Sequence, residues 1–288
     1  MREFDFLSPR SIHEAIELLS ERQDEVHVLA GGTNLLVGMR EGTITPRAVM
    51  SLKKLSDFRM INHSKETGLR LGAMVTLRQI GRSPQVRDHY PCLADTALMM
   101  ASEQIRTLAT VGGNLCNAAP SADMAPPLIA LDAVVRLIGP GGERRLPLEE
   151  FFLGPGNNAL GSGELLAEIE VPPTERTTRY MRLTPRVHMD IVVVSVAAGI
   201  QVENSEVLAA RIVLGAVAPV PLRVRPAEEV LIGKPLTQAA IEAASSIATE
   251  ESSPISDVRG SDWYRKRMVG VLVARTLRSL SEPELATA

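Results

Sequence analysis

The spacing of apolar and polar residues predicts a small unit of helix and strand at the start of the chain. Residues 11–22 place apolar side chains at helical spacing, and Ser11 with Glu14 three positions later is typical of a capping box. Residues 26–29 and 48–52 are short apolar runs that predict strands. The first of these strands leads directly into paired glycines, which places a glycine-rich segment at a strand end.

The middle of the chain continues the alternation of elements. The pattern predicts strands at 68–74, 133–138 and 165–171, and helices at 76–80, 91–101, 103–108 and 124–131. Small residues and a proline between positions 118 and 123 indicate an irregular, closely packed backbone. Pro140-Gly141-Gly142 predicts a turn.

Pro172-Pro173 and the polar residues 174–178 form the best candidate for a domain boundary. Beyond it the pattern predicts two long strands at 191–201 and 211–216, joined by a turn at Asn204-Ser205, and helices at 227–231, 237–248 and 262–280. The last third of the chain is therefore expected to be strands packed against helices. There are no internal repeats and no low-complexity segment.

Composition narrows the classes of function. The chain has 288 residues, of which 45% are hydrophobic, 23% charged and only 3% aromatic, with a formal net charge of −3. Neither nucleic acid nor an anionic membrane is a favoured partner at this charge, and aromatic platforms for single-stranded nucleic acid are lacking. No apolar run approaches the roughly 18 residues of a membrane span, and no signal peptide is visible. We expect a soluble, cytoplasmic protein without membrane insertion.

Cysteine usage excludes an iron–sulfur cluster and a cysteine-rich zinc site in this chain. Cys92 and Cys116 are the only two cysteines, whereas an iron–sulfur cluster generally takes four ligands. No His or Cys pair sits at metal-ligand spacing, so we predict no metal site. Both cysteines are expected to be small buried hydrophobes. Redox chemistry in this chain would therefore need an organic cofactor.

Two glycine-rich segments are the candidates for binding such a cofactor. The first glycine segment is residues 30–34 and the second glycine segment is residues 110–114; each combines paired glycines with Thr and Asn. Glycine allows positive φ and a close approach to a ligand, and successive N–H groups can form a concavity that suits a diphosphate. Either segment alone would also fit an ordinary tight turn. Neither fits the dinucleotide G-x-G-x-x-G motif, and neither is followed by the lysine of a Walker loop.

Together with their flanks, the two segments resemble a known family. Residues 29–36 resemble the first FAD-binding loop, and residues 105–114 the second, of the molybdenum hydroxylase flavoproteins of the xanthine dehydrogenase and aerobic carbon monoxide dehydrogenase type. Residues 117–123, 165–172, 186–191 and 257–265 are similar to further family motifs in the same order. The resemblance spans nearly the whole chain.

The resemblance implies an α+β fold in two domains. Residues 1–175 would form a two-part FAD-binding domain of the PCMH-like type, with a small α/β unit at about 1–57 and a larger α+β unit at 58–175. Residues 176–288 would form a C-terminal domain of antiparallel sheet packed with helices. Both glycine segments would wrap the FAD diphosphate.

The family motifs identify the expected FAD-binding residues, and no conventional catalytic acid or base is expected. They are Leu29, Ala30, Gly31, Gly32, Thr33, Asn34, Leu35, Leu36, Met100, Thr110, Gly113, Asn114, Ser121, Asp123, Leu166 and Arg182.

Four of these residues have a second interpretation. Asp123 fits an acceptor for ribose or ribityl hydroxyls, and also an N-cap for the helix that starts at Met124. Met100 and Leu166 match positions near the flavin ring, and equally fit plain core packing. Arg182 falls where relatives have a lysine near the flavin, whose potential a cation would tune; a surface arginine is the interpretation we favour.

The resemblance also implies partners and an electron path. A large subunit with a molybdopterin cofactor would act on the substrate, and a small subunit with two [2Fe–2S] clusters would relay electrons to the FAD of this chain. The FAD would pass them to NAD⁺, a quinone, oxygen or another acceptor. We expect a dimer of heterotrimers. The hydroxybenzoyl-CoA-reducing branch carries a cysteine-bearing insertion for a [4Fe–4S] cluster, and this chain lacks that insertion.

Two other functions are alternatives to an FAD-containing electron-transfer subunit, and each makes a different demand on the sequence. A stand-alone FAD-dependent oxidase would need its own substrate-covering domain and usually a much longer chain. A scaffold subunit that keeps the fold without the cofactor would not need intact glycines in both segments.

Overall fold

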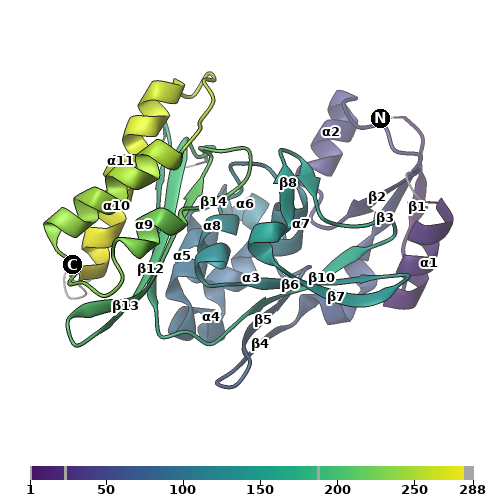
Figure 1. The fold of residues 1–288 in the computed structure, drawn as a ribbon. Helices are drawn as coiled ribbons and strands as arrows, with labels where there is room; N and C mark the ends of the chain where they lie inside the picture. The colour runs from purple at the N-terminus through teal and green to yellow at the C-terminus, as the bar shows by residue number, and fades with distance from the viewer. Residues whose placement is uncertain (1, 23–24, 187–188, 282–288) are drawn as a thin grey trace.

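The molecule consists of three successive sheet-and-helix units. The structure, a computed structural model, describes residues 2–22, 25–186 and 189–281. The N-terminal unit, the middle unit and the C-terminal unit lie side by side in chain order, so that the middle one contacts both others (Figure 1). Two antiparallel sheets, of five and four strands, are packed with helices, which confirms the predicted α+β class.

The N-terminal unit is a parallel sheet in the order β1-β3-β2. Its elements are β1 (Asp5–Leu7), α1 (Ile12–Arg22), β2 (Val26–Leu29), α2 (Leu35–Glu41) and β3 (Ala48–Ser51). The Ser11 hydroxyl accepts the N–H of Glu14, which confirms the predicted start of α1. The Glu14 carboxylate reaches back to the N–H of Arg10 rather than to that of Ser11.

The middle unit is a five-stranded antiparallel sheet in the order β4-β5-β10-β6-β7, with six helices. Its strands are β4 (Ile61–Ser64), β5 (Gly68–Gly72), β6 (Val134–Gly139), β7 (Gly142–Pro147) and β10 (Leu165–Val171), with the small pair β8 (Phe152–Gly154) and β9 (Asn157–Asn158) beside it. Its helices are α3 (Leu77–Arg82), α4 (Pro84–His89), α5 (Pro91–Met99), α6 (Glu103–Arg106), α7 (Val111–Cys116) and α8 (Ala125–Ala130). A capping box between Thr76 and Gln79 starts α3.

The C-terminal unit is an antiparallel sheet in the order β11-β12-β13-β14 covered by helices. Its elements are β11 (Thr177–Leu183), β12 (Val194–Glu203), β13 (Glu206–Gly215), β14 (Leu222–Arg223), α9 (Arg225–Glu229), α10 (Gln238–Glu251) and α11 (Asp262–Ser281). Asn204 and Ser205 both have positive φ, as a two-residue hairpin turn requires, so the predicted turn is confirmed. Across the described ranges, no helix is long and apolar enough for a membrane span.

The sequence pattern missed several strands and misplaced the ends of others. β1, β4, β7, β8, β9, β11 and β14 were not predicted. β7 carries Glu143, Arg144 and Arg145 in succession and lies at a sheet edge, so it lacks the apolar alternation of a half-buried strand. The expected linker at 174–178 is shorter than predicted, because β11 already begins at Thr177 to pair with β12. β12 begins at Val194 rather than at residue 191.

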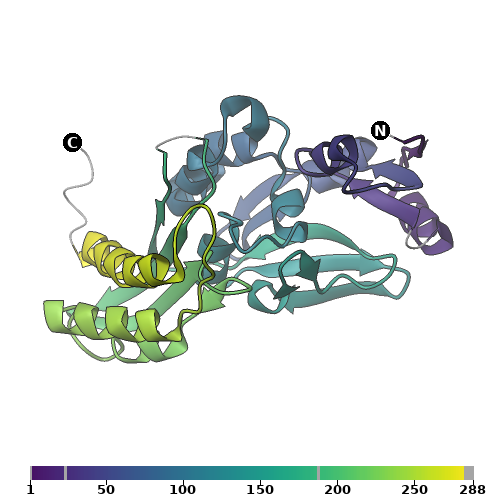
Figure 2. The same cartoon turned by 90° about the horizontal axis from the view of Figure 1, so that it is seen from above.

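Helix α8 lies between the middle sheet and the C-terminal sheet (Figures 1 and 2). All of its residues are buried, and the core around it includes Tyr180, Ala197 and Val213 from the C-terminal sheet. A separate core joins α1 and β3 to β10 through Leu165 and Ala167. The segment that leads into α8 is therefore held where the middle and C-terminal units meet.

Asp132, directly after α8, joins these two units through two ion pairs. Its carboxylate accepts from Arg211 Nε of β13 at 2.8 Å and from Arg176 Nη2 at 2.5 Å. Burial alone would raise the pKa of Asp132, but the bonds and charges of Arg211 and Arg176 outweigh it and hold that pKa below its ordinary value.

This depressed pKa predicts a pH-dependent contribution to stability. A carboxyl with a lower pKa in the folded state stabilises the fold above its unfolded pKa of about 4 and loses that contribution as the pH falls below it. We expect Asp132→Asn, which still tolerates the positive φ of this position, to lower the free energy of unfolding at pH 7 by about 1–2 kcal/mol. Urea titrations should show this difference shrinking towards pH 3; a difference that is the same at both pH values would contradict the assignment.

Candidate functional site

The first glycine segment connects β2 to α2 and carries a row of backbone donors. Among the hydrogen bonds of the described residues, none has the N–H of residues 31–35 as its donor. Gly32 has φ +76°, a conformation that favours glycine, and all five residues line a cavity. Successive N–H groups without a protein acceptor are the arrangement expected of an anion-binding concavity.

The first glycine segment packs directly against the residues before the second. A Cβ added to Gly31 would lie 2.2 Å from the carbonyl oxygen of Leu108 and 2.9 Å from Cα of Ala109. Leu29 and Leu36, which the motif included, pack around Gly32 and do not line the cavity. The absence of a side chain at Gly31 therefore sets the distance between the two segments.

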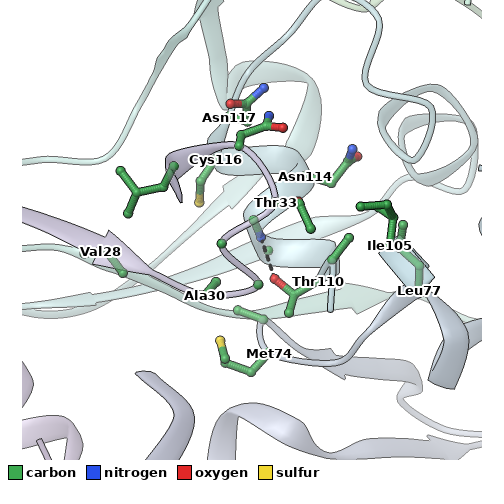
Figure 3. Close-up of a pocket in the computed structure, with 18 of the residues that line it drawn as sticks. Val28, Ala30, Thr33, Met74, Leu77, Ile105, Thr110, Asn114, Cys116 and Asn117 are labelled. Carbon is green, nitrogen blue, oxygen red and sulfur yellow. Dashed lines mark hydrogen bonds between the residues drawn. The ribbon is translucent and has the colours of Figure 1, made fainter. Parts of the chain in front are cut away.

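The second glycine segment is the start of helix α7 rather than a tight turn, and neither of its glycines has the positive φ that glycine allows. Thr110 is the N-cap, and its hydroxyl oxygen accepts the N–H of Gly113 at 3.0 Å (Figure 3). Gly112 is needed for a close approach instead, because its Cβ would lie 2.6 Å from the carbonyl oxygen of Ala73. The N–H of Gly112 donates to that same oxygen at 3.0 Å, which ties α7 to the end of β5.

Both segments open onto one cavity of about 730 Å³, a size typical of cofactor sites. It brings together most of the expected residues: Ala30, Gly31, Gly32, Thr33, Asn34, Leu35, Met100, Thr110, Gly113, Asn114, Ser121, Asp123 and Leu166. Figure 3 shows Thr33, Thr110 and Asn114 close together, on segments far apart in the sequence. Asn114 lines the cavity, and its Oδ1 is buried without a hydrogen-bond partner in the described part of the chain.

Asp123 does not cap α8, so the N-cap interpretation was wrong. Met124 is the N-cap and makes no side-chain cap bond. The Asp123 carboxylate instead accepts two donors on Oδ1, from the Tyr180 hydroxyl at 2.6 Å and from Arg182 Nη1 at 3.0 Å. Both donors come from β11 of the C-terminal sheet.

Arg182 is not a surface residue, so that preferred interpretation was also wrong. Its side chain is only 7% exposed because it pairs with Asp123. Arg182 does not line the cavity, whereas its partner Asp123 does, so Arg182 can influence a bound group by holding Asp123 in place.

The cavity also includes residues that the sequence did not single out. Met74 and Leu77 follow β5, Ile105 lies on α6, Asn117 follows α7, and residues 189–191 come from the C-terminal unit. Asn117 and Ile191 stand inside segments that resembled family motifs, so the motif positions carried a signal for them.

The two cysteines differ in position but not in chemistry. Cys92 is buried in the core as predicted, whereas Cys116 is partly exposed and lines the cavity. Burial raises the pKa of each thiol to about 12. Both therefore remain thiols at neutral pH, and neither is an activated nucleophile. Within residues 2–22, 25–186 and 189–281, no three His, Cys, Asp or Glu side chains gather as a metal site.

Comparison with known families gives two consecutive matches. The profile described as FAD binding domain in molybdopterin dehydrogenase matches residues 2–174. The profile described as CO dehydrogenase flavoprotein C-terminal domain matches residues 179–280.

Similar proteins match over nearly their whole length. The putative xanthine dehydrogenase FAD-binding subunit of Escherichia coli is 30% identical over 95% of this chain and 96% of its own. The carbon monoxide dehydrogenase medium chain of Afipia carboxidovorans is 32% identical over 95% of each chain. A solved chain of carbon monoxide dehydrogenase from Hydrogenophaga pseudoflava superposes with a TM-score of 0.94 at 31% identity, covering 97% of this chain and 98% of that one.

Proposed function

The chain belongs to the FAD-binding medium subunits of the molybdenum hydroxylase family, and we propose that its two glycine segments hold the FAD diphosphate between them. As a member it is a subunit of an oxidoreductase. The observation that carries the proposal is the row of N–H groups at residues 31–35, which belong to cavity-lining residues and have no acceptor among the described residues.

The cavity fits a diphosphate held by neutral donors. No Lys or Arg is among the lining residues of the described chain. Backbone N–H groups that converge on an anion form short, charge-assisted hydrogen bonds with it. They can therefore bind the anion without a cationic side chain. The Thr33 and Thr110 hydroxyls extend the donor set, and the contact at Gly31 keeps the two segments close enough to serve one group.

The remainder of the cavity suits the other parts of the cofactor. Asp123 and Ser121 line the cavity and offer acceptors for sugar or ribityl hydroxyls. Met100 and Leu166 are apolar lining residues that can pack on the flavin ring. FAD held here would supply the redox chemistry, while these side chains would bind and orient it.

We further propose the assembly and the electron path that the family implies. The relatives carry names such as medium chain and FAD-binding subunit, which supports a complex with a small [2Fe–2S] subunit and a large molybdopterin subunit, as a dimer of heterotrimers. Electrons would leave through NAD⁺ or another acceptor. The two profile matches and the separate C-terminal sheet support a division of the chain near residue 175, with the first domain in two parts near residue 57.

Flavin content of the purified chain tests the proposal. We expect about one FAD per chain, retained through gel filtration or regained when the FAD-free chain is titrated with FAD. A folded chain that takes up no FAD would support a cofactor-free scaffold instead. Isolation of the tagged chain from its source cells should recover two further subunits, with iron and molybdenum measurable in the complex.

A further inference from the structure

Strand β11 of the C-terminal sheet reaches across to the cofactor cavity of the preceding domain. Tyr180 and Arg182 are two residues apart on this strand, so their side chains leave the same face of the sheet. Both donate to one atom, Oδ1 of Asp123, at 2.6 and 3.0 Å. The side chains of Arg182 and Asp123 are 7% and 10% exposed, so this cluster is shielded from bulk water.

The Tyr180 hydroxyl is a permanent donor in this cluster. Burial, and then the charge of Asp123, raise the pKa of Tyr180 well above its ordinary value. The phenol therefore keeps its proton at neutral pH and donates it in the hydrogen bond to Asp123 Oδ1. Tyr180 does not line the cavity, so any influence that it has on a bound group passes through its neighbours.

With both donors on Oδ1, the second carboxylate oxygen of Asp123 stays available. In the described ranges no hydrogen bond to Oδ2 is formed, and Asp123 lines the cavity. A carboxylate accepts several hydrogen bonds, and fixing one oxygen fixes the direction of the other.

We propose that Tyr180 is a positioning residue for the cofactor: together with Arg182 it holds Asp123 so that Oδ2 accepts a hydroxyl group of bound FAD. This inference rests on the proposed function. It makes the C-terminal domain a part of the FAD site, because the acceptor that it orients belongs to the FAD-binding domain. FAD binding is then expected to stabilise the contact between β11 and the segment before α8.

Tyr90 provides a matched control for this role. Its hydroxyl is also buried in part and donates at 3.1 Å to the carbonyl oxygen of Pro172, and it does not line the cavity. Tyr90→Phe and Tyr180→Phe each remove one hydroxyl and the internal hydrogen bonds that it donates. Only Tyr180→Phe removes a donor from Asp123.

The test is titration of the FAD-free full chain with FAD, followed by flavin fluorescence, for wild type and both variants. We expect Tyr180→Phe to raise the Kd for FAD about tenfold, the worth of one charge-assisted hydrogen bond, and Tyr90→Phe to leave it within about twofold. Melting temperatures of the FAD-free variants should fall by similar amounts. Equal Kd values for the two variants would overturn the proposal.

A double-mutant cycle identifies Asp123 as the group through which Tyr180 acts. Asp123→Asn should weaken FAD binding further than Tyr180→Phe does, and adding Tyr180→Phe to it should change the Kd by less than about twofold. If the changes in Kd from the two substitutions multiply in the double variant, Tyr180 does not act through Asp123, and the proposal is overturned. If Asp123→Asn binds no FAD, the cycle cannot be completed, and the Kd of Tyr180→Phe relative to that of Tyr90→Phe then supports or overturns the proposal. A wild-type chain that binds no FAD would instead refute the proposed function itself.

Discussion

Replacing Gly31 with valine is expected to weaken FAD binding by about 100-fold or more while the chain still folds. The reason is the contact between the two glycine segments. A Cβ at this position would lie 2.2 Å from the backbone oxygen of Leu108, and backbone cannot swing aside as a flexible side chain can. The first segment must therefore move away from the second.

Such a movement misaligns the donors rather than unfolding the protein. Overpacking costs about 1–3 kcal/mol, which is less than the stability of an ordinary domain. Two displaced hydrogen bonds to a charged group cost about 3 kcal/mol or more in binding, which is the source of the expected loss. Isothermal titration with FAD measures the affinity, and circular dichroism verifies the fold.

Gly154→Val is the matched control for this prediction. Gly154 lies in β8, has no heavy atom within 4 Å of an added Cβ, and does not have the positive φ that would strain a side chain. We expect its FAD affinity to equal that of the wild type. Near-normal FAD affinity in Gly31→Val would show that the close approach of the two segments has no role in binding.

Arg106→Met is expected to have the second largest effect, on stability and on FAD affinity together. Arg106 Nη1 donates to the carbonyl oxygens of Met100 at 2.7 Å and Ala101 at 3.1 Å, and its side chain is 15% exposed. Ala101 has φ +46°, a strained conformation for a residue with a Cβ. Met100, Ala101 and Ser102 all line the cavity, so Arg106 holds one of its walls.

The expected size follows from the bonds that are lost. Two hydrogen bonds from a charged donor contribute about 3 kcal/mol to stability, and a relaxed Ala101 would raise the Kd for FAD by about tenfold or more. Arg106→Lys should recover part of both losses, because an ammonium reaches one carbonyl but lacks the guanidinium fork. Chemical denaturation and FAD titration measure the two effects.

Arg82→Met is the control that removes a positive charge beside Glu103 without removing a hydrogen bond to the backbone. Arg82 donates to Glu103, as Arg106 does, but its side chain is 59% exposed and the pair is a surface one. We expect a change within about 0.5 kcal/mol and an unchanged Kd. If Arg106→Met behaves as Arg82→Met does, the backbone bonds of Arg106 have no part in shaping the cavity.

The sequence predicted those elements of the fold that are defined by a short stretch of residues. β2 and β10 have the predicted bounds because each is rich in apolar residues and is followed closely by glycine or proline. β7 and β11 were missed because charged and polar residues interrupt them, and their strand character comes from pairing with β6 and β12. Register across a sheet depends on residues that are distant in sequence, so no local pattern contains it.

The same distinction applies to the site. The glycine segments were visible as motifs, but the reason for Gly112 is its contact with Ala73, which only the fold brings close. Arg182 was expected on the surface because it stands where relatives have a lysine, which left its role at the flavin in doubt. Its partner, Asp123, lies 59 positions earlier and in the other domain, so the ion pair could not be inferred locally.

A crystal structure of this chain with FAD would show whether the two glycine segments hold the diphosphate. We expect diphosphate oxygens about 3 Å from the N–H groups of residues 31–35, with the second glycine segment on the opposite side. A diphosphate bound elsewhere in the cavity, with these N–H groups bonded to water alone, would show that the segments do not hold it.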